Sequence, residues 1–159
     1  MNVAGELIVG YDGSDRAREA LRFACDLAGP DSAVSVIHAY ELPPEIAQYD
    51  FFSDFKGAWG EVTQEILDSA RDCVADSTRV TYEAVSGKPA DVLVEAAQAR
   101  NASLILIGGR GAGSMLGALG SVTHRVLHRA PCPVLVVPER DAPAGEDVAL
   151  RAHEHGQRP

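Results

Sequence analysis

Five short aliphatic runs alternate with stretches of helical periodicity, and this alternation constrains the fold more than any other feature of the chain. The runs are "LIVGY" (7–11), "VSVIHAY" (34–40), "VTYEAV" (80–85), "SLILIG" (103–108) and "PVLVV" (133–137). The first, fourth and fifth are continuously apolar, which is typical of strands covered on both faces, as in a parallel sheet flanked by helices.

Apolar residues between the runs recur at i, i+3, i+4 and i+7, the spacing of one helix face. Ser14 is placed to begin the first helix and Gly29-Pro30 to end it, while Pro89 opens the third and "APCP" ends the fourth. The four stripes are Ala17, Ala20, Leu21, Ala24, Leu27 and Ala28; Val62, Ile66, Ala70, Cys73 and Val74; Leu93, Ala96, Ala97 and Arg100; and Val122, Val126, Leu127 and Ala130. The order β-α-β-α-β-α-β-α-β predicts an α/β fold: a single open five-stranded parallel sheet with helices on both faces, doubly wound and Rossmann-like.

Two segments fall outside this pattern. Residues 41–60 fit neither period and predict a long connection after the second strand, either an irregular loop or a lid. From Glu139 onward the chain is charged and poor in bulky residues, which predicts a flexible tail over 139–159. The predicted domain is therefore 1–138.

The charge of the chain restricts its partners. The net charge of −9 argues against binding nucleic acid or an anionic membrane surface. No run of eighteen apolar residues and no basic leader is present, so a cytoplasmic protein without a membrane segment is expected. The three cysteines are far apart in sequence and are predicted to be reduced core thiols.

The acidic residues are unevenly distributed. No aspartate or glutamate lies between Glu95 and Glu139, whereas four arginines, at 100, 110, 125 and 129, give that stretch a charge of +4 and leave −13 for the remainder. A glycine-rich segment, "IGGRGAGSMLGALGSVTHR" (107–125), lies inside this basic stretch and contains six glycines. Such a density of glycine indicates sharp turns or close approach to a ligand.

Two polar turns leave strand ends that are expected to face one crevice: "YDGSD" (11–15) after the first strand and "GGRGAGSM" (108–115) after the fourth. Glycines 108 to 113 can present backbone N–H groups to an anion, and the helix that opens at Gly120-Ser121 adds the positive end of its dipole. Arg110 and the hydroxyls of Ser121 and Thr123 are further candidate donors. A phosphate group is the predicted ligand.

The common phosphate motifs fit poorly. The chain has no GxxxxGK[ST], and Gly87-Lys88 is followed by Pro89, which argues against a Walker-type NTPase. The third glycine of a Rossmann fingerprint is replaced by Ser114, and the segment follows the fourth strand rather than the first.

The sequence resembles the universal stress protein family over about residues 5–138, through "ELIVGYDGSDRAREALRFACDLA", "VIHAY", "GKPADVLVEAAQ", "SLILIGGRG" and "GSVTHRVLHRAPCPVLVV". ATP-binding members carry G-x2-G-x9-G-[ST] after the fourth strand, and this chain supplies Gly108, Gly111, Gly120 and Ser121. Its second gap is eight residues rather than nine, a deletion that a loop containing Gly113 and Gly117 can absorb. The resemblance implies a fold of the adenine nucleotide alpha hydrolase-like type.

The resemblance also implies the roles of individual residues. Asp12 and the backbone of Ala39 would contact the adenine. Gly108 and Gly111 would lie against the ribose and phosphates, and the phosphate chain would be surrounded by Gly120, Ser121, Val122 and Thr123. The residue pattern of the loop adds Arg110 and Gly113 as candidate contacts. The implied function is an ATP-binding stress-response module, with Mg²⁺ offsetting the acidic charge and a homodimer formed through the fifth strand (134–137). No catalytic residue and no protein-bound metal is predicted.

Two other functions remain open. A slow ATPase or phosphoryl-transfer enzyme would need carboxylates near the phosphates, where the sequence offers Asp12 and Asp15. A nucleotide-free dimeric scaffold is the other alternative, because the shortened loop would permit it.

Several of these residues also have purely structural interpretations. Asp12 with Gly13 could simply form the turn into the first helix, and Ser121 could be the N-cap of the fourth. His124 and His128 have the i, i+4 spacing of a metal pair, but no third ligand is near them in sequence, so a solvated helix face is predicted. His38 is predicted to be a hydrogen-bonded core residue.

Overall fold

Strands and helices alternate along the chain as the sequence predicts. The computed structural model describes residues 2–42, 53–74, 79–109 and 119–138. Its elements are β1 (Val3–Gly10), α1 (Asp15–Leu27), β2 (Ala28–Tyr40), α3 (Ser53–Arg71), β3 (Val80–Ser86), α4 (Pro89–Ala99), β4 (Leu104–Gly108), α5 (Ser121–Arg129) and β5 (Val134–Val137). The predicted tail from Glu139 lies outside the described residues.

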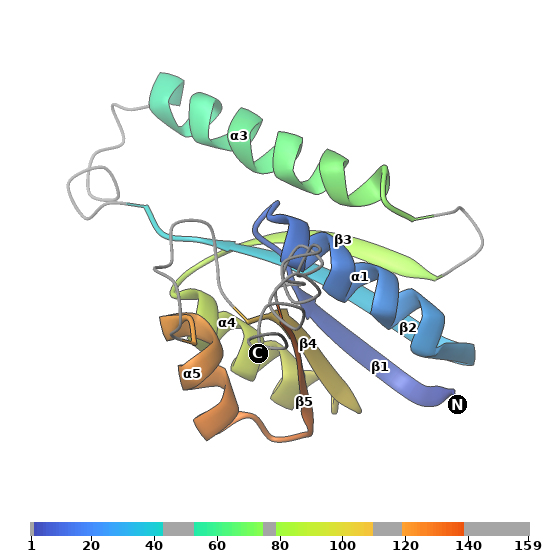
Figure 1. Ribbon diagram of the computed structural model, residues 1–159. Helices are drawn as coiled ribbons and strands as arrows, with labels where there is room; N and C mark the ends of the chain where they lie inside the picture. Colours follow the sequence, from blue (N-terminus) through green and yellow to red (C-terminus); the bar gives the residue numbers. More distant parts are fainter. Residues whose placement is uncertain (1, 43–52, 75–78, 110–118, 139–159) are drawn as a thin grey trace, which may run out of the picture.

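The five strands form one parallel sheet in the order β3-β2-β1-β4-β5. The chain proceeds from β1 outward to β2 and β3, then returns across the sheet to β4 and β5. Helices α1 and α3 lie on one face and α4 and α5 on the other (Figure 1). The predicted doubly wound architecture is confirmed. Its direction of winding reverses between β1 and β4, which is where ligands bind in folds of this type.

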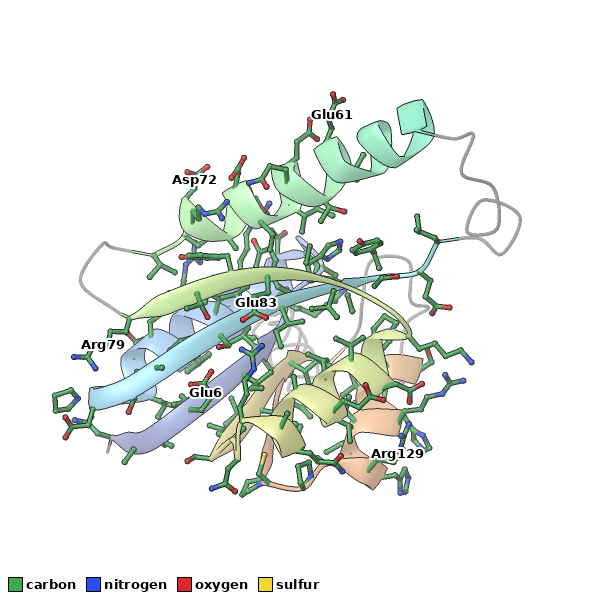
Figure 2. The ribbon with its side chains drawn as sticks, turned by 180° about the vertical axis from the view of Figure 1, so that it is seen from behind. Glu6, Glu61, Asp72, Arg79, Glu83 and Arg129 are labelled. Atoms are coloured by element: carbon green, nitrogen blue, oxygen red, sulfur yellow. The ribbon has the colours of Figure 1, made fainter. Side chains whose placement is uncertain are left out.

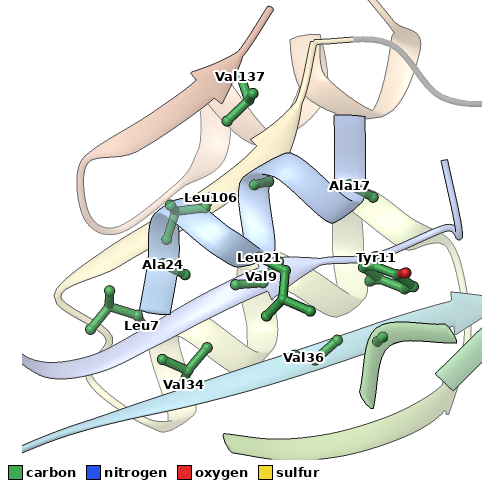
Figure 3. Packing of buried hydrophobic residues seen from close by; sticks show 12 residues of the cluster. Leu7, Val9, Tyr11, Ala17, Leu21, Ala24, Val34, Val36, Leu106 and Val137 are labelled. Atoms are coloured by element: carbon green, nitrogen blue, oxygen red, sulfur yellow. The ribbon is translucent and has the colours of Figure 1, made fainter. Parts of the chain in front are cut away.

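Each face of the sheet has its own hydrophobic core. Leu7 and Val9 of β1 point toward α1, together with Leu106 of β4 (Figure 3). Ile8, between them in sequence, packs on the opposite face with Ile105 and residues of α4 and α5. All five of these side chains have no exposed surface. Burial on both faces explains why the β1 and β4 runs are continuously apolar.

The boundaries of two elements differ from the sequence prediction. Helix α1 ends at Leu27 with Ala28 as its C-cap, directly before the predicted stop at Gly29-Pro30, but β2 begins at Ala28 and not at Val34. Helix α3 begins at Ser53, so the end of the 41–60 segment is helical and not an irregular connection. The part of that segment at 43–52 lies outside the described residues.

One residue in each of two predicted helical stripes is exposed and does not face the core. Val62 of α3 and Leu127 of α5 are 50% and 45% exposed, while Thr63 and Thr123 take the inward positions. Cys73 and Val74 lie beyond the end of α3 but still pack against the core, and Arg100 is the C-cap of α4. Because a threonine can bury its methyl group while its hydroxyl bonds to the backbone, hydropathy is a poor guide to these two positions.

An ion-pair cluster at the amino end of the strands uses one arginine of the basic stretch. Arg100 donates to both carboxylate oxygens of Glu83, at 2.8 and 2.6 Å, and to the hydroxyl of Ser35 at 2.9 Å. Glu6 lies 3.8 Å from the same guanidinium. Figure 2 shows Glu6 and Glu83 on the sheet beside α4. The charge of Arg100 is thus neutralised at the end of the sheet opposite the glycine turns.

A second arginine of the basic stretch is also paired. Arg129, near the end of α5, donates to the carboxylate of Asp91 on α4. Two of the four arginines of the basic stretch are bound to acids, and neither is at the carboxyl end of the sheet.

The Glu83–Arg100 pair makes stability depend on pH. The hydrogen bonds from Arg100 hold the pKa of Glu83 below its ordinary value of 4.5. A lowered carboxyl pKa stabilises the fold above pH 4.5, and this contribution is lost as the pH falls through the pKa of the folded state. We expect Glu83→Gln to be less stable than the parent at pH 7 in urea unfolding, and the difference to shrink below about pH 4.5. A difference that stays constant down to pH 3 would contradict this account.

Candidate functional site

The two polar turns meet at the carboxyl ends of β1 and β4. These strands are paired through Leu7–Leu104, Ile8–Ile105 and Val9–Leu106. Continuing this register by two residues places Tyr11 opposite Gly108. The turn after β1 and the loop after β4 therefore leave the sheet side by side, at its switch point.

The first turn is held by local hydrogen bonds. The carboxylate of Asp12 accepts from the backbone N–H of Ser14 at 3.0 Å, and Gly13 has φ +80. The hydroxyl of Ser14 then caps α1 by accepting from Ala17 N–H at 3.2 Å. The structural interpretation of Asp12 is correct as far as it goes. Its side chain is also exposed at the edge of the sheet, where a ligand can reach it.

The second turn is closed at its base by backbone groups. Gly109 N–H donates to the carbonyl of Val137 at 2.8 Å, and Gly120 N–H donates to the carbonyl of Gly109 at 2.9 Å. A Cβ at residue 109 would lie 3.3 Å from the Val137 oxygen, so this close approach favours glycine. Gly109 is a site-forming residue that we did not single out from the sequence, because its neighbour Val137 comes from another strand. Arg110, Gly111 and Gly113 lie outside the described residues.

Thr123 connects the start of α5 to the end of β4. Its buried hydroxyl donates to the carbonyl of Gly108 at 2.8 Å. That hydroxyl has a single proton, which this bond uses, so it does not serve as the phosphate donor that we expected. The hydrogen bonds from Thr123 to Gly108 and from Gly120 to Gly109 attach the start of α5 to the end of β4.

The start of α5 exposes backbone donors. The N-cap is Gly120 and not Ser121, which corrects the sequence interpretation, and no side-chain hydrogen bond caps the helix among the described residues. The first N–H bonded within the helix is that of His124, which donates to Gly120 O at 2.9 Å. The N–H groups of Ser121, Val122 and Thr123 precede it and have no carbonyl to bond within the helix. They point outward at the positive end of the helix dipole.

The backbone of Ala39 faces the space beyond the end of β1. Tyr11 N–H donates to Ile37 O at 3.0 Å, whereas Tyr40 O accepts from Gly87 N–H at 2.9 Å on the β3 side. Backbone groups two residues apart in a strand point to the same side, so Ala39 shares the direction of Ile37. The last residue pair between β1 and β2 is Gly10–Ile37. The backbone N–H and C=O of Ala39 therefore point toward the β1 side at a level beyond the last paired residue of β1.

Tyr11 and His38 form hydrogen bonds at the ends of β1 and β2, next to Ala39. The Nδ1 atom of His38 lies 2.9 Å from Tyr11 O, and because a carbonyl only accepts, Nδ1 carries the proton. The Tyr11 hydroxyl lies 3.0 Å from the Ser69 hydroxyl, and burial raises the pKa of Tyr11. His38 is hydrogen-bonded as predicted, although it is half-buried rather than in the core. These contacts attach the end of β1 to both β2 and α3.

The geometry agrees with the comparison to known proteins. The model of the universal stress protein family matches residues 5–138. The chain belongs to the universal stress protein family. A universal stress protein encoded in the QAH/OAS sulfhydrylase 3′ region of Thermus aquaticus is 32% identical over 133 residues, which cover 82% of this chain and 96% of the relative.

Two solved structures are similar to this universal stress protein. A universal stress protein in complex with cAMP has a TM-score of 0.57 and 29% identity, covering 84% of this chain and 95% of that one. The universal stress protein from Archaeoglobus fulgidus in complex with dAMP has a TM-score of 0.56 and 25% identity, covering 86% and 99%. Within the described ranges, this universal stress protein has no helix with the length and apolar character needed to cross a bilayer.

Proposed function

We propose that this universal stress protein is a cytoplasmic stress-response module that binds ATP with Mg²⁺ at the carboxyl edge of the sheet. The observation that carries the proposal is the start of α5, with glycine at the N-cap and three backbone N–H groups that have no carbonyl partner within the helix, beside the strand switch point. The binding domain is taken as residues 1–138.

The phosphates would be bound at the start of α5. Gly120 has no side chain to occupy the helix end, so an anion can approach the N–H groups of Ser121, Val122 and Thr123 directly. The hydroxyl of Ser121, which is exposed, is a further donor. Gly108, and the loop residues Arg110, Gly111 and Gly113, complete the proposed phosphate and ribose contacts.

The adenine would be bound on the other side of the switch point. The backbone N–H and C=O of Ala39 can pair with the edge of a purine, which presents a donor and an acceptor side by side. Asp12 is exposed and follows β1, the strand between β2 and β4. Its carboxylate would therefore lie beside the nucleoside, between Ala39 and the phosphates. The structures similar to this chain that hold cAMP and dAMP support an adenine nucleotide as the ligand class.

Mg²⁺ would arrive with the triphosphate and shield its charge from the acidic chain. Mg²⁺ prefers oxygen ligands and is usually held by phosphates, waters and one or two carboxylates. Because no protein ligand for the metal is predicted, phosphate oxygens and water would hold Mg²⁺ in the complex.

The first experiment is to identify any nucleotide that copurifies with the protein and to measure thermal stability with Mg-ATP. Ligand at 100 times its Kd stabilises the folded state by about 2.7 kcal/mol. For a domain of this size we expect Tm to rise by roughly 5–11 °C. Parallel titrations with AMP and cAMP would define the phosphate requirement. No released nucleotide and no shift with any of the three would favour the nucleotide-free scaffold.

Hydrolysis is a separate question with a separate readout. The two acids that the sequence offers for it already have partners, because Asp12 bonds to Ser14 N–H and Asp15 to Arg18. ADP formation above the rate without protein, lost on Asp12→Ala, would favour the slow ATPase. Binding of ATP without ADP formation would favour the regulatory module.

We further propose a homodimer through β5. The sheet order leaves this strand at an edge, and its Leu135 side chain is 36% exposed. An aliphatic strand edge without a partner invites association with another copy.

Leu135→Lys is expected to convert the dimer to a monomer, because a lysine on an edge strand opposes strand pairing. Light scattering after size-exclusion chromatography measures this, with Val62→Lys on α3 as a control substitution at another exposed site. A parent protein that is monomeric at about 50 μM, a concentration at which stable interfaces persist, would remove the dimer proposal.

A further inference from the structure

The exposed face of α5 carries two histidines whose ring nitrogens converge. His124 and His128 are both exposed, and their Nε2 atoms lie 3.3 Å apart. The ring centroids are 4.5 Å apart and the rings are inclined at 61°, so the nitrogens meet at one edge and the rings do not stack face to face. Residues four apart on a helix occupy the same face, which explains the approach.

The separation of these nitrogens matches the requirement of a tetrahedral metal ion. Zn²⁺ binds imidazole nitrogen at 2.0–2.1 Å, so two imidazoles at a tetrahedral angle have their nitrogens about 3.3–3.4 Å apart. A hydrogen bond between neutral rings accounts for the same distance, with one Nε2 donating to the other. A metal ion would bind both Nε2 atoms in place of that hydrogen bond, and the donating ring would shift its proton from Nε2 to Nδ1, so that both rings stay neutral with Nδ1 protonated.

The electrostatic surroundings of the pair are compatible with a cation. His128 lies in the last turn of α5, where the carbonyl end of the helix favours positive charge. The nearby Arg129 is neutralised by Asp91, so its charge does not act unopposed on the site. Arg125 is the neighbouring cation that works against binding.

We propose that His124 and His128 form a two-histidine surface site for a divalent transition-metal ion of the zinc class. No group of three or more histidine, cysteine, aspartate or glutamate residues suited to a metal occurs in the described part of the chain. In this proposal, water or an exchangeable external ligand completes the coordination of the ion. Imidazole selects Zn²⁺, Cu²⁺ or Ni²⁺ over Mg²⁺, so the site is chemically distinct from the magnesium of the proposed nucleotide complex.

The test is calorimetric titration of the nucleotide-free full chain with Zn²⁺. Two further histidines, His153 and His155, are replaced by asparagine in every protein compared, so that their own affinity for metal does not contribute. We expect one Zn²⁺ per chain, unaffected by millimolar Mg²⁺, and roughly tenfold or greater weakening by His124→Asn or His128→Asn, because a second ligand on the same helix raises the effective concentration.

The matched control keeps both histidines but changes their spacing. The double substitution Arg125→His, His128→Arg preserves the composition and charge of α5 and places the second ring one residue after His124, where side chains do not face each other. It should bind Zn²⁺ as weakly as the single asparagine variants, while circular dichroism reports that α5 and the fold are retained. Zn²⁺ binding that is unchanged by His124→Asn, or equal in the spacing control, would overturn the proposal.

Discussion

Gly120→Asp is expected to remove most of the stabilisation by Mg-ATP while making the ligand-free protein slightly more stable. Residue 120 is the N-cap of α5 with φ −60 and ψ 148, a conformation that any residue adopts, and it has no side-chain cap. Aspartate would accept from the N–H groups of the first turn and add on the order of 0.5 kcal/mol. Its charge would occupy the position proposed for phosphate.

The expected effect on binding is large. If repulsion weakens binding by about 100-fold, ATP at 100 times the original Kd stabilises by only about 0.4 kcal/mol. The Tm shift of roughly 5–11 °C would then fall to about 1–2 °C. Thermal unfolding with and without Mg-ATP measures both effects on one sample.

Gly120→Ser is the matched control for this variant. It supplies a capping oxygen without a charge, so its ligand-free stability should also rise, and its loss of affinity should be smaller than that of aspartate. An aspartate variant that keeps the full shift with Mg-ATP would mean that the phosphates do not bind at the start of α5.

Leu106→Ala is expected to lower the free energy of unfolding by about 2–5 kcal/mol. Leu106 lies on β4, between β1 and β5, and has no exposed surface (Figure 3). Alanine would leave a cavity against Leu7 and Leu21, which belong to the same cluster and are also fully buried. Urea unfolding, monitored by circular dichroism, measures the loss.

Leu127→Ala makes the same chemical change on the surface. Leu127 is 45% exposed on α5, and its truncation should cost about 1 kcal/mol or less. Equal losses for the two leucines would contradict the assignment of Leu106 to the core. Leu106→Ala changes the core beneath the binding edge, whereas Gly120→Asp changes the edge itself. Comparing the two variants therefore separates a loss of fold stability from a loss of nucleotide binding.

The sequence predicted the order of the elements because the signals for it are local. Continuous aliphatic runs such as 103–108 indicate strands buried on both faces, and apolar residues at helical spacing indicate the helices between them. The two polar turns could be assigned to one edge of the sheet because parallel strands joined by helices all point the same way. The resemblance to the universal stress proteins, confirmed over 5–138, agrees with the same order.

The exact ends of elements were harder to predict. Gly29-Pro30 follows the C-cap of α1, as predicted for a helix stop, yet these residues also belong to β2, which begins at Ala28 and not at Val34. The pairing of β1 with β2 begins at Val3–Ala28, so hydrogen bonds to a distant strand override the local preference of glycine and proline.

What the sequence determined by itself is therefore the type and order of the strands and helices, and the edge at which the glycine-rich turns emerge. The tertiary structure decided which donors and charges remain available there. Arg100 is neutralised by Glu83, the Thr123 hydroxyl is taken by Gly108, and Gly120 caps α5 in place of Ser121. Each of these outcomes depends on a partner from another element or on backbone geometry. Hydrophobic periodicity predicts which side chains face the core, but it does not predict the hydrogen-bond or ion-pair partners of the polar side chains.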